Sequence, residues 1–148
     1  MKPSYAALKA ANFLSDTAAT DLALSASNPG SINKSALRMS LTLLECGLPF
    51  MGRLPVKTGR HQGKFVEPGT TRLAEQLSMR SILGKPEIFT DAEIAKYDLS
   101  YKRGVVFFEP ITGYDGGHID LLEPANATLL CSVYGYFNCK AIWFWELA

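Results

Sequence analysis

The stretch Asn33-Lys34-Ser35-Ala36-Leu37-Arg38-Met39-Ser40 opens the helix around which we expect this chain to fold. We predict that helix over about Ile32 to Cys46. Its apolar positions recur at i, i+4 and i+7, which is the spacing of one buried face: Leu37, Leu41 and Leu44. No other segment of the chain is as clearly patterned as a helix.

Residues with known terminal preferences mark both ends of this helix. Ser31 or Asn33 can cap its start, because short polar side chains accept hydrogen bonds from the first free backbone N–H groups. Gly47 and Pro49 end it. Ser35 then lies near the first turn, on a second face that it shares with Arg38, Met39, Thr42 and Cys46.

The composition is that of an ordinary soluble globule, with 47% apolar and 20% charged residues among 148. We expect one domain over residues 1–148 with a substantial core. The formal net charge of +1 argues against a nucleic-acid platform or a basic membrane-binding patch. No apolar run approaches the roughly 18 residues of a membrane-spanning helix. Lys9 and Asn12 interrupt the N-terminal apolar stretch, so we expect no Sec signal and no membrane insertion.

Apolar spacing and capping residues predict three further helices: Pro3 to Leu14, Thr70 or Thr71 to about Leu83, and the capping box Thr90-Asp91-Ala92-Glu93 to about Tyr97. Residues 15–30 indicate turns with at most one helical turn. Residues 48–70 are rich in glycine, proline and basic residues, and predict a surface loop with one extended piece near 64–66.

The C-terminal part of the chain predicts four strands, over residues 103–109, 117–122, 128–134 and 141–147. The first is a continuous apolar run, which is typical of a central strand. The second alternates His118 and Asp120 with Ile119 and Leu121. Helices followed by an antiparallel sheet predict an α+β fold.

Ser35 occupies a position with two interpretations. Near a helix N-terminus, unpaired N–H groups and the macrodipole favour negative charge, so a cysteine there would exist partly as thiolate. The same N–H groups could also bind the oxyanion of the tetrahedral intermediate that forms when the thiolate attacks a carbonyl. A serine hydroxyl is far too weak an acid to ionise in that field and needs a base. From residue chemistry alone Ser35 is a capping serine, and no G-x-S-x-G motif indicates a serine hydrolase.

His118 is the second candidate, and it is one of two histidines in the chain. It follows Gly116 and Gly117, which allow another group to approach the backbone closely. It is either a structural strand histidine or a general base that needs a polar group to orient its ring. Asp120 lies on the same strand face at the limit of direct contact, and the turn that follows offers Glu123 and Asn126.

The three cysteines show no metal-binding spacing, so we expect no metal and no cofactor. Cys46 is interpreted as a core residue. Cys131 and Cys139 either close a small disulfide loop in an oxidising compartment or remain two reduced thiols, and the spacing alone does not decide between these.

Taken together, these motifs resemble the fourth family of type VI secretion peptidoglycan amidase effectors. The family pattern Asn-x-Cys-Ala-aliphatic-Arg-Met-Ser matches residues 33–40, and Gly-His-aliphatic-Asp-Leu matches residues 117–121. A Tyr-Phe pair and an apolar C-terminal strand match Tyr136-Phe137 and Trp143-Phe144-Trp145-Glu146. The resemblance covers most of the chain, from about Asn33 to Leu147.

This resemblance implies a papain-like (NlpC-type) fold and an amidase that cuts the γ-D-glutamyl–meso-diaminopimelate bond of peptidoglycan stem peptides. The implied catalytic residues are position 35, His118 and Asp120. Delivery by the type VI apparatus from the producer's cytoplasm to the periplasm of a target cell agrees with the missing signal sequence, and a periplasmic site would agree with a Cys131–Cys139 disulfide. The implied partner is a cognate periplasmic immunity protein.

The chain departs from the family pattern at the nucleophile, where Ser35 replaces cysteine. Either a natural cysteine was exchanged to make a toxic enzyme safe to produce, or the chain is a degenerate member that binds without catalysis. The retention of Arg38, Met39, Ser40 and His118 favours the first explanation. The family's third catalytic residue is an acid beyond the histidine strand, and the turn at residues 123–126 does not align with it.

Overall fold

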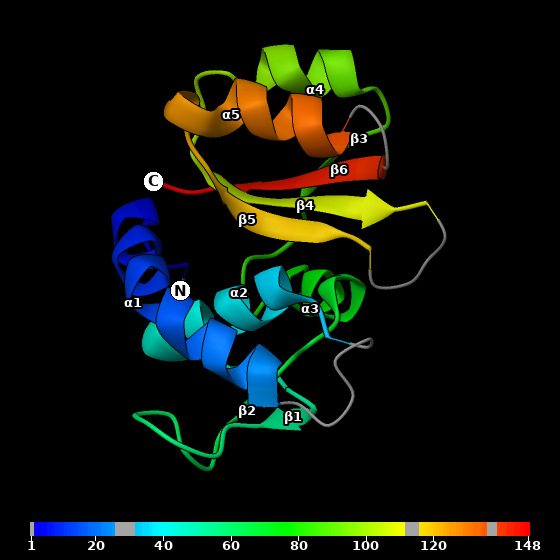
Figure 1. The fold of residues 1–148 in the computed structure, drawn as a ribbon. Coiled ribbons are helices and arrows are strands. Elements are labelled where there is room, and N and C mark those ends of the chain that lie inside the picture. Colours follow the sequence, from blue (N-terminus) through cyan, green and yellow to red (C-terminus); the bar gives the residue numbers. More distant parts are fainter. Residues whose placement is uncertain (1, 26–31, 112–115, 136–138) are drawn as a thin grey trace.

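The computed structural model describes residues 2–25, 32–111, 116–135 and 139–148. Figure 1 shows a sheet with α1, α2 and α3 on one face and α4 and α5 on the other. The elements in chain order are α1 (Tyr5–Ser25), α2 (Lys34–Glu45), β1 (Leu54–Pro55), β2 (Phe65–Val66), α3 (Thr70–Leu77), β3 (Glu87–Phe89), α4 (Ala92–Asp98), β4 (Gly104–Pro110), β5 (His118–Leu122), α5 (Pro124–Leu130), the π-helical turn η2 (Cys131–Gly135) and β6 (Cys139–Glu146).

The main sheet has the order β3-β6-β4-β5, and every neighbouring pair is antiparallel. The predicted α+β fold is therefore confirmed, as are the strands expected over 103–109, 117–122 and 141–147. β4 is the central strand, buried along most of its length, and β5 is an edge strand. Its His118 pairs with Phe108 and its Asp120 with Val106, so both side chains lie on one face of the sheet.

Two hydrophobic clusters cover the two faces of the sheet. The first includes Ile119 and Leu121 of β5 and packs against α1, α2 and α3, with Met39 and Leu43 at its centre. The second includes Phe108 and Phe144 and packs against α4 and α5. The alternation of β5 thus places the side chain of Ile119 toward α2 and that of His118 toward α5, beside Phe108.

The central helix is buried on more sides than its sequence indicates. Leu37 and Leu41 are buried as predicted, but they form a separate cluster with Val56 and Val66. Met39, expected on the other face, is 1% exposed and joins the main core. The segment at residues 48–70 wraps over the helix, so the predicted surface loop also supplies core, through the β1–β2 ribbon.

The N-terminal helix is longer than predicted. Residues 15–25, expected as turns, continue α1 to Ser25. The hydroxyls of Ser15 and Thr20 donate to the backbone carbonyls four residues earlier. These bonds are compatible with the helix, so the two side chains do not draw the backbone into a turn. Ala19 is fully buried against α2, so tertiary packing overrides the local turn signals. The predicted turn at residues 28–30 lies outside the described residues.

Three other boundaries differ from the prediction. The predicted strand at 128–134 is wrong, because α5 begins after Glu123 with Pro124 at its first position, and a capping box joins Glu123 to Asn126. α3 ends at Leu77 rather than near Leu83. The short edge strand β3 was not predicted. α4 begins where it was expected, but its cap is Asp91 rather than Thr90, the first residue of the predicted capping box. No helix among the described residues is long and apolar enough to cross a membrane.

Candidate active site

Asn33 caps α2 and gathers several donors around Ser35. Its side-chain Oδ1 accepts hydrogen bonds from the backbone N–H groups of Ser35 and Ala36, at 2.9 and 3.2 Å. The Ser35 hydroxyl donates to the same oxygen at 2.6 Å. Asn33 also donates its own N–H to the Pro68 carbonyl. The cap predicted at Ser31 or Asn33 is therefore Asn33, and it fixes the first turn of the helix.

The start of α2 is joined directly to β5. The Asn33 side-chain amide donates to the Gly117 carbonyl at 2.7 Å, and the Ile119 N–H donates to Ser35 Oγ at 3.2 Å. Both strand groups point away from β4, because β5 is the edge strand. A side chain at Gly117 would meet Thr70 Oγ1 at 2.6 Å and the Phe108 carbonyl at 2.9 Å, so glycine is required for this close approach.

His118 is held by contacts in its ring plane and across its ring face. Its Nε2 lies 3.1 Å from Asp120 Oδ2. From the sequence it was open whether Asp120 could reach the ring, and in the structure the two groups are in direct contact. The imidazole also stacks on the Tyr134 ring, with centroids 4.0 Å apart and planes 7° from parallel. Because Nε2 faces Asp120, Nδ1 is the nitrogen that remains for a nucleophile.

Glu123 and Asn126, the two other orienting candidates, have separate tasks. Glu123 accepts from Lys9 Nζ at 2.8 Å, which joins α5 to α1. Asn126 accepts from the Glu123 N–H and donates to the Leu121 carbonyl, so it caps α5. The structure therefore places Asp120, and neither of these residues, against the imidazole.

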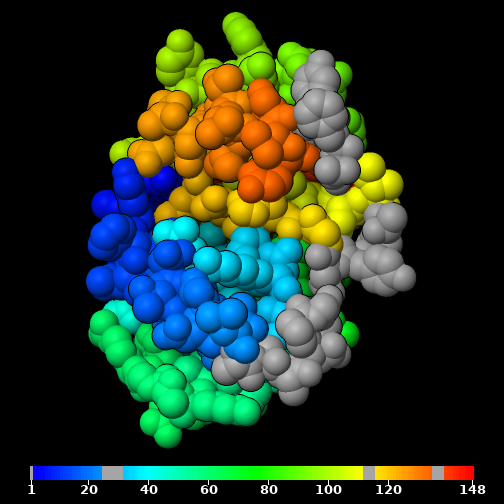
Figure 2. All heavy atoms as spheres, in the orientation of Figure 1, coloured from blue at the N-terminus to red at the C-terminus, as the bar shows by residue number. Residues whose placement is uncertain are grey.

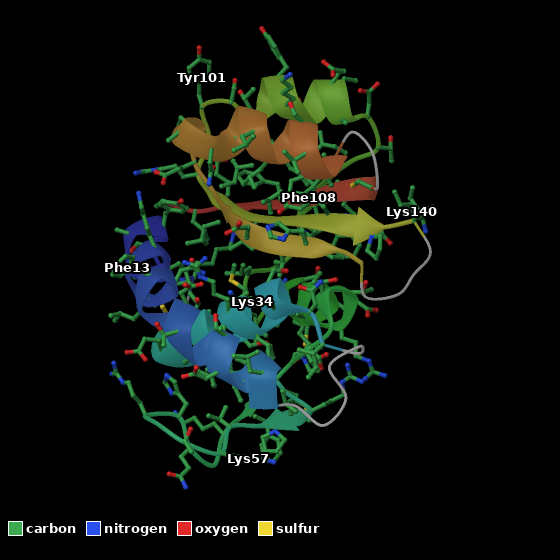
Figure 3. All side chains as sticks on the ribbon, viewed as in Figure 1. Phe13, Lys34, Lys57, Tyr101, Phe108 and Lys140 are labelled. Carbon is green, nitrogen blue, oxygen red and sulfur yellow. The ribbon has the colours of Figure 1, made fainter. Side chains whose placement is uncertain are left out.

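Ser35, His118 and Asp120 line one pocket of about 410 Å³, together with Asn12, Asp16, Ile32, Asn33, Lys34, Arg38 and Ile119. Figure 2 shows the atoms of α1, the start of α2 and β5 meeting on one face of the molecule. Arg38 donates through Nε to the Asn12 carbonyl and lies 3.7 Å from the Asp16 carboxylate. In Figure 3, Lys34 lies at the start of α2, below the sheet.

Several residues of this site were not found from the sequence. Asn12 and Asp16 come from a helix whose second half was expected as turns, and Tyr134 comes from a segment expected as a strand. Nothing in their local patterns indicates a site, because their role depends on the tertiary packing that brings residues of α1 and η2 close to β5. The sequence named Asn33 as a possible cap but not as the link between α2 and Gly117.

The Ser35 hydroxyl is arranged as a structural group in this site. It donates its proton to Asn33 and accepts the Ile119 N–H, so both of its hydrogen-bonding functions are occupied. Neither bond reaches His118. The backbone N–H groups of Ser35 and Ala36, which the sequence suggested for an oxyanion, are bound to Asn33.

The three cysteines do not line the pocket, and all are free thiols in this structure. Of the two alternatives left open for Cys131 and Cys139, the structure therefore has reduced thiols and not a disulfide. Burial, as the main cause, raises the pKa of each of these two thiols to about 11. No group of three or more His, Cys, Asp or Glu residues within the described ranges is arranged to hold a metal ion.

A family model described as "Type VI secretion system (T6SS), amidase effector protein 4", abbreviated Tae4, matches residues 32–145. No curated protein matches the chain. Among solved structures, Tae4 of the Tae4/Tai4 effector–immunity system from Salmonella typhimurium, in its selenomethionine variant, superposes with a TM-score of 0.67 at 20% identity, over 99% of each chain. The type VI effector–immunity complex Tae4-Tai4 from the same organism gives 0.66 at 19% identity, again over 99% of each chain. These likenesses show that the fold is shared.

Proposed function

The chain belongs to the type VI secretion amidase effector protein 4 family, and from this premise we propose that its site is built to hydrolyse the γ-D-glutamyl–meso-diaminopimelate bond of peptidoglycan stem peptides. In this proposal the nucleophile is a cysteine at position 35, where this chain has a serine. One observation carries the proposal: Ser35, in the first turn of α2, shares a pocket with the His118–Asp120 pair.

Each residue has a defined task in this mechanism. His118 takes the thiol proton at Nδ1, because its Nε2 is held by Asp120, and the sulfur attacks the amide carbonyl carbon. The Lys34 N–H, which has no hydrogen-bond partner among the described residues, is the first candidate donor to the oxyanion. The carbon–nitrogen bond then breaks as His118 returns the proton to the leaving amine. Water, activated by the same imidazole, hydrolyses the thioester.

With serine at position 35 we propose that the enzyme is inactive. In this chain the hydroxyl donates its proton to Asn33 Oδ1 at 2.6 Å rather than to His118. The helix terminus can stabilise a thiolate but cannot ionise an alcohol. The cap, the histidine and its carboxylate partner are in place around this residue, which favours a replaced cysteine over a decayed site.

The test is to restore the thiol with Ser35→Cys and to incubate the protein with purified muropeptides, with products separated by mass spectrometry. We expect cleavage between D-glutamate and diaminopimelate, abolished by His118→Ala in the same background. Ser81→Cys, an exposed thiol elsewhere, and His61→Ala, a histidine paired with Glu45, are the matched controls. A folded Ser35→Cys protein that releases no stem-peptide fragment overturns the proposal.

One observation favours a second candidate, a binding module without catalysis. Both hydrogen-bonding functions of the Ser35 hydroxyl are satisfied within the protein, as expected of a structural serine. Under this alternative Ser35→Cys gives no turnover, whereas the unmodified chain is retained on purified cell-wall sacculi in a sedimentation assay. Turnover by Ser35→Cys excludes it.

The setting of the reaction is part of the proposal. We propose delivery by the type VI apparatus into the periplasm of target bacteria, followed by inhibition by an immunity protein that covers the pocket. The immunity partner is supported by the Salmonella Tae4 structures, which come from an effector–immunity pair. Co-purification of the chain with the product of a neighbouring gene, lost when a bulky residue replaces Ser35, would test this part.

A further inference from the structure

We infer that Tyr134 is a positioning residue for His118, and that its ring holds the imidazole in the orientation that catalysis requires. This inference rests on the proposed function, because it assigns Tyr134 a part in the same reaction. Its basis is the near-parallel stack, with ring centroids 4.0 Å apart and planes 7° from parallel.

The stack supplies a constraint that Asp120 does not. The Asp120 carboxylate holds the ring through one atom, Nε2, and leaves the imidazole free to rotate about that contact. A ring lying flat against it removes this rotation, because any tilt would drive the two faces together. Phe108 extends the cluster, with its centroid 5.5 Å from Tyr134 and 6.4 Å from His118. Figure 3 places Phe108 on β4, on the side of the sheet that α5 covers.

The backbone that carries Tyr134 is suited to this task. β5 is followed by α5 and then by the π-helical turn η2, from which the Tyr134 ring reaches His118 at the start of β5. π-Helical turns within helices are often found at functional sites. Cys131, at the start of this turn, is 1% exposed and packs in the hydrophobic cluster formed with α4 and β6. This packing holds the turn against the sheet. Tyr134 itself is only partly buried, which leaves its ring at the rim of the site.

The stack also acts on the charged intermediate. When His118 takes the thiol proton it becomes an imidazolium, and an aromatic face attracts a cation more strongly than a neutral ring. A side chain that only filled space would give neither this attraction nor the restraint on rotation. Tyr134→Phe should therefore keep the function, whereas Tyr134→Leu, which removes the aromatic face, should weaken it.

The kinetic test uses the Ser35→Cys protein. We expect Tyr134→Leu to lower kcat by about 3- to 30-fold, the effect of one aromatic or cation–π pair, with KM little changed. Tyr134→Phe should stay within about twofold of the parent. Tyr97→Leu, which removes a tyrosine that is 83% exposed on α4, is the matched control and should have no effect.

A spectroscopic test uses the unmodified chain and needs no turnover. Only two histidines are present, so the imidazole C–H signals of His118 and His61 can be assigned by proton NMR. Ring current from Tyr134 should displace the His118 signals, and Tyr134→Leu should move them toward the values of a free histidine while those of His61 stay fixed.

The outcomes separate the two proposals. If Ser35→Cys releases no fragment, the proposed function fails and this inference fails with it. If that protein is active and Tyr134→Leu leaves kcat unchanged, or Tyr134→Phe is as damaged as Tyr134→Leu, the inference is overturned and the proposed function stands. His118 signals that do not move in Tyr134→Leu overturn it as well.

Discussion

Asn33 joins α2 to β5, and replacing it should destabilise the protein measurably. Asn33→Ala removes the cap acceptor of two N–H groups and of the Ser35 hydroxyl, which costs about 1 kcal/mol, with a range of about 0.5–2. It also removes the 2.7 Å bond to the Gly117 carbonyl and leaves that partly buried group unpaired, which costs roughly 1–2 kcal/mol more. The sum is about 2–4 kcal/mol.

A second substitution separates these two contributions. Asn33→Ser keeps a hydroxyl that can cap α2 but cannot reach the Gly117 carbonyl, so it should lose only the second contribution. For a chain of this size each kcal/mol lowers Tm by about 2–4 °C. We therefore expect a fall of roughly 4–16 °C for Asn33→Ala and about half of that for Asn33→Ser.

The assay is thermal unfolding followed by circular dichroism, together with amide exchange at Ile119, whose N–H donates to Ser35 Oγ. Exchange at Ile119 should become faster in both variants, because the junction between α2 and β5 loosens. An Asn33→Ala protein whose Tm lies within about 2 °C of the parent, or an Asn33→Ser protein that is as unstable as Asn33→Ala, would refute this account of the junction.

Two further predictions concern the same framework. Gly117→Ala should lower the free energy of unfolding, measured in urea, by about 1–3 kcal/mol, because its new methyl group would meet the Phe108 carbonyl at 2.9 Å. Gly116→Ala should leave it unchanged, because nothing lies within 4 Å of the added methyl group. Equal stability of the two variants would contradict the requirement for glycine at position 117. The free energy of unfolding should fall as pH rises from about 9 toward 11, because the buried thiols of Cys131 and Cys139 keep their protons to about pH 11 while unfolded thiols lose them near pH 9. Tyr5, whose pKa burial raises to about 12, adds to this loss above pH 10, and a Cys131→Ala/Cys139→Ala double variant should show a shallower slope.

The sequence was most informative where local pattern and tertiary packing agree. The apolar run of β4 and the alternation of β5 predicted their strands, because one is buried on both faces and the other presents its two faces to different surroundings. Ser35, His118 and Asp120 were named as a set, and the structure brings them to one pocket, although their catalytic roles remain a proposal.

The two largest failures have different physical origins: one is a contact between distant segments, and the other is a local helix-start signal that was interpreted as a turn. Residues 15–25 carry turn-forming side chains, yet burial of Ala19 against α2 keeps them helical. Residues 128–134 contain β-forming side chains, yet Pro124 and the Glu123–Asn126 capping box begin a helix just before them. The packing of Ala19 is not reported by any local propensity, whereas the start of α5 is a local signal that was interpreted as a turn. Asp16 and Tyr134, which line the pocket and form the histidine stack, were missed together with these two segments.

The edge strand β5 is the element on which both halves of the site depend. Its backbone contacts Asn33 and Ser35 through the Gly117 carbonyl and the Ile119 N–H, while its alternate side chains supply the proposed base His118 and its partner Asp120. A slip of one residue in its pairing with β4 would turn His118 and Asp120 toward the face of the sheet covered by α1, α2 and α3, and Ile119 toward the face covered by α4 and α5. The core pairing of Ile119 with Phe107 therefore fixes the register on which the position of His118 depends. Packing and the geometry of the pocket are set by the same strand, so a polar residue in place of Ile119 should lower both the Tm of the protein and the proposed activity of its Ser35→Cys form.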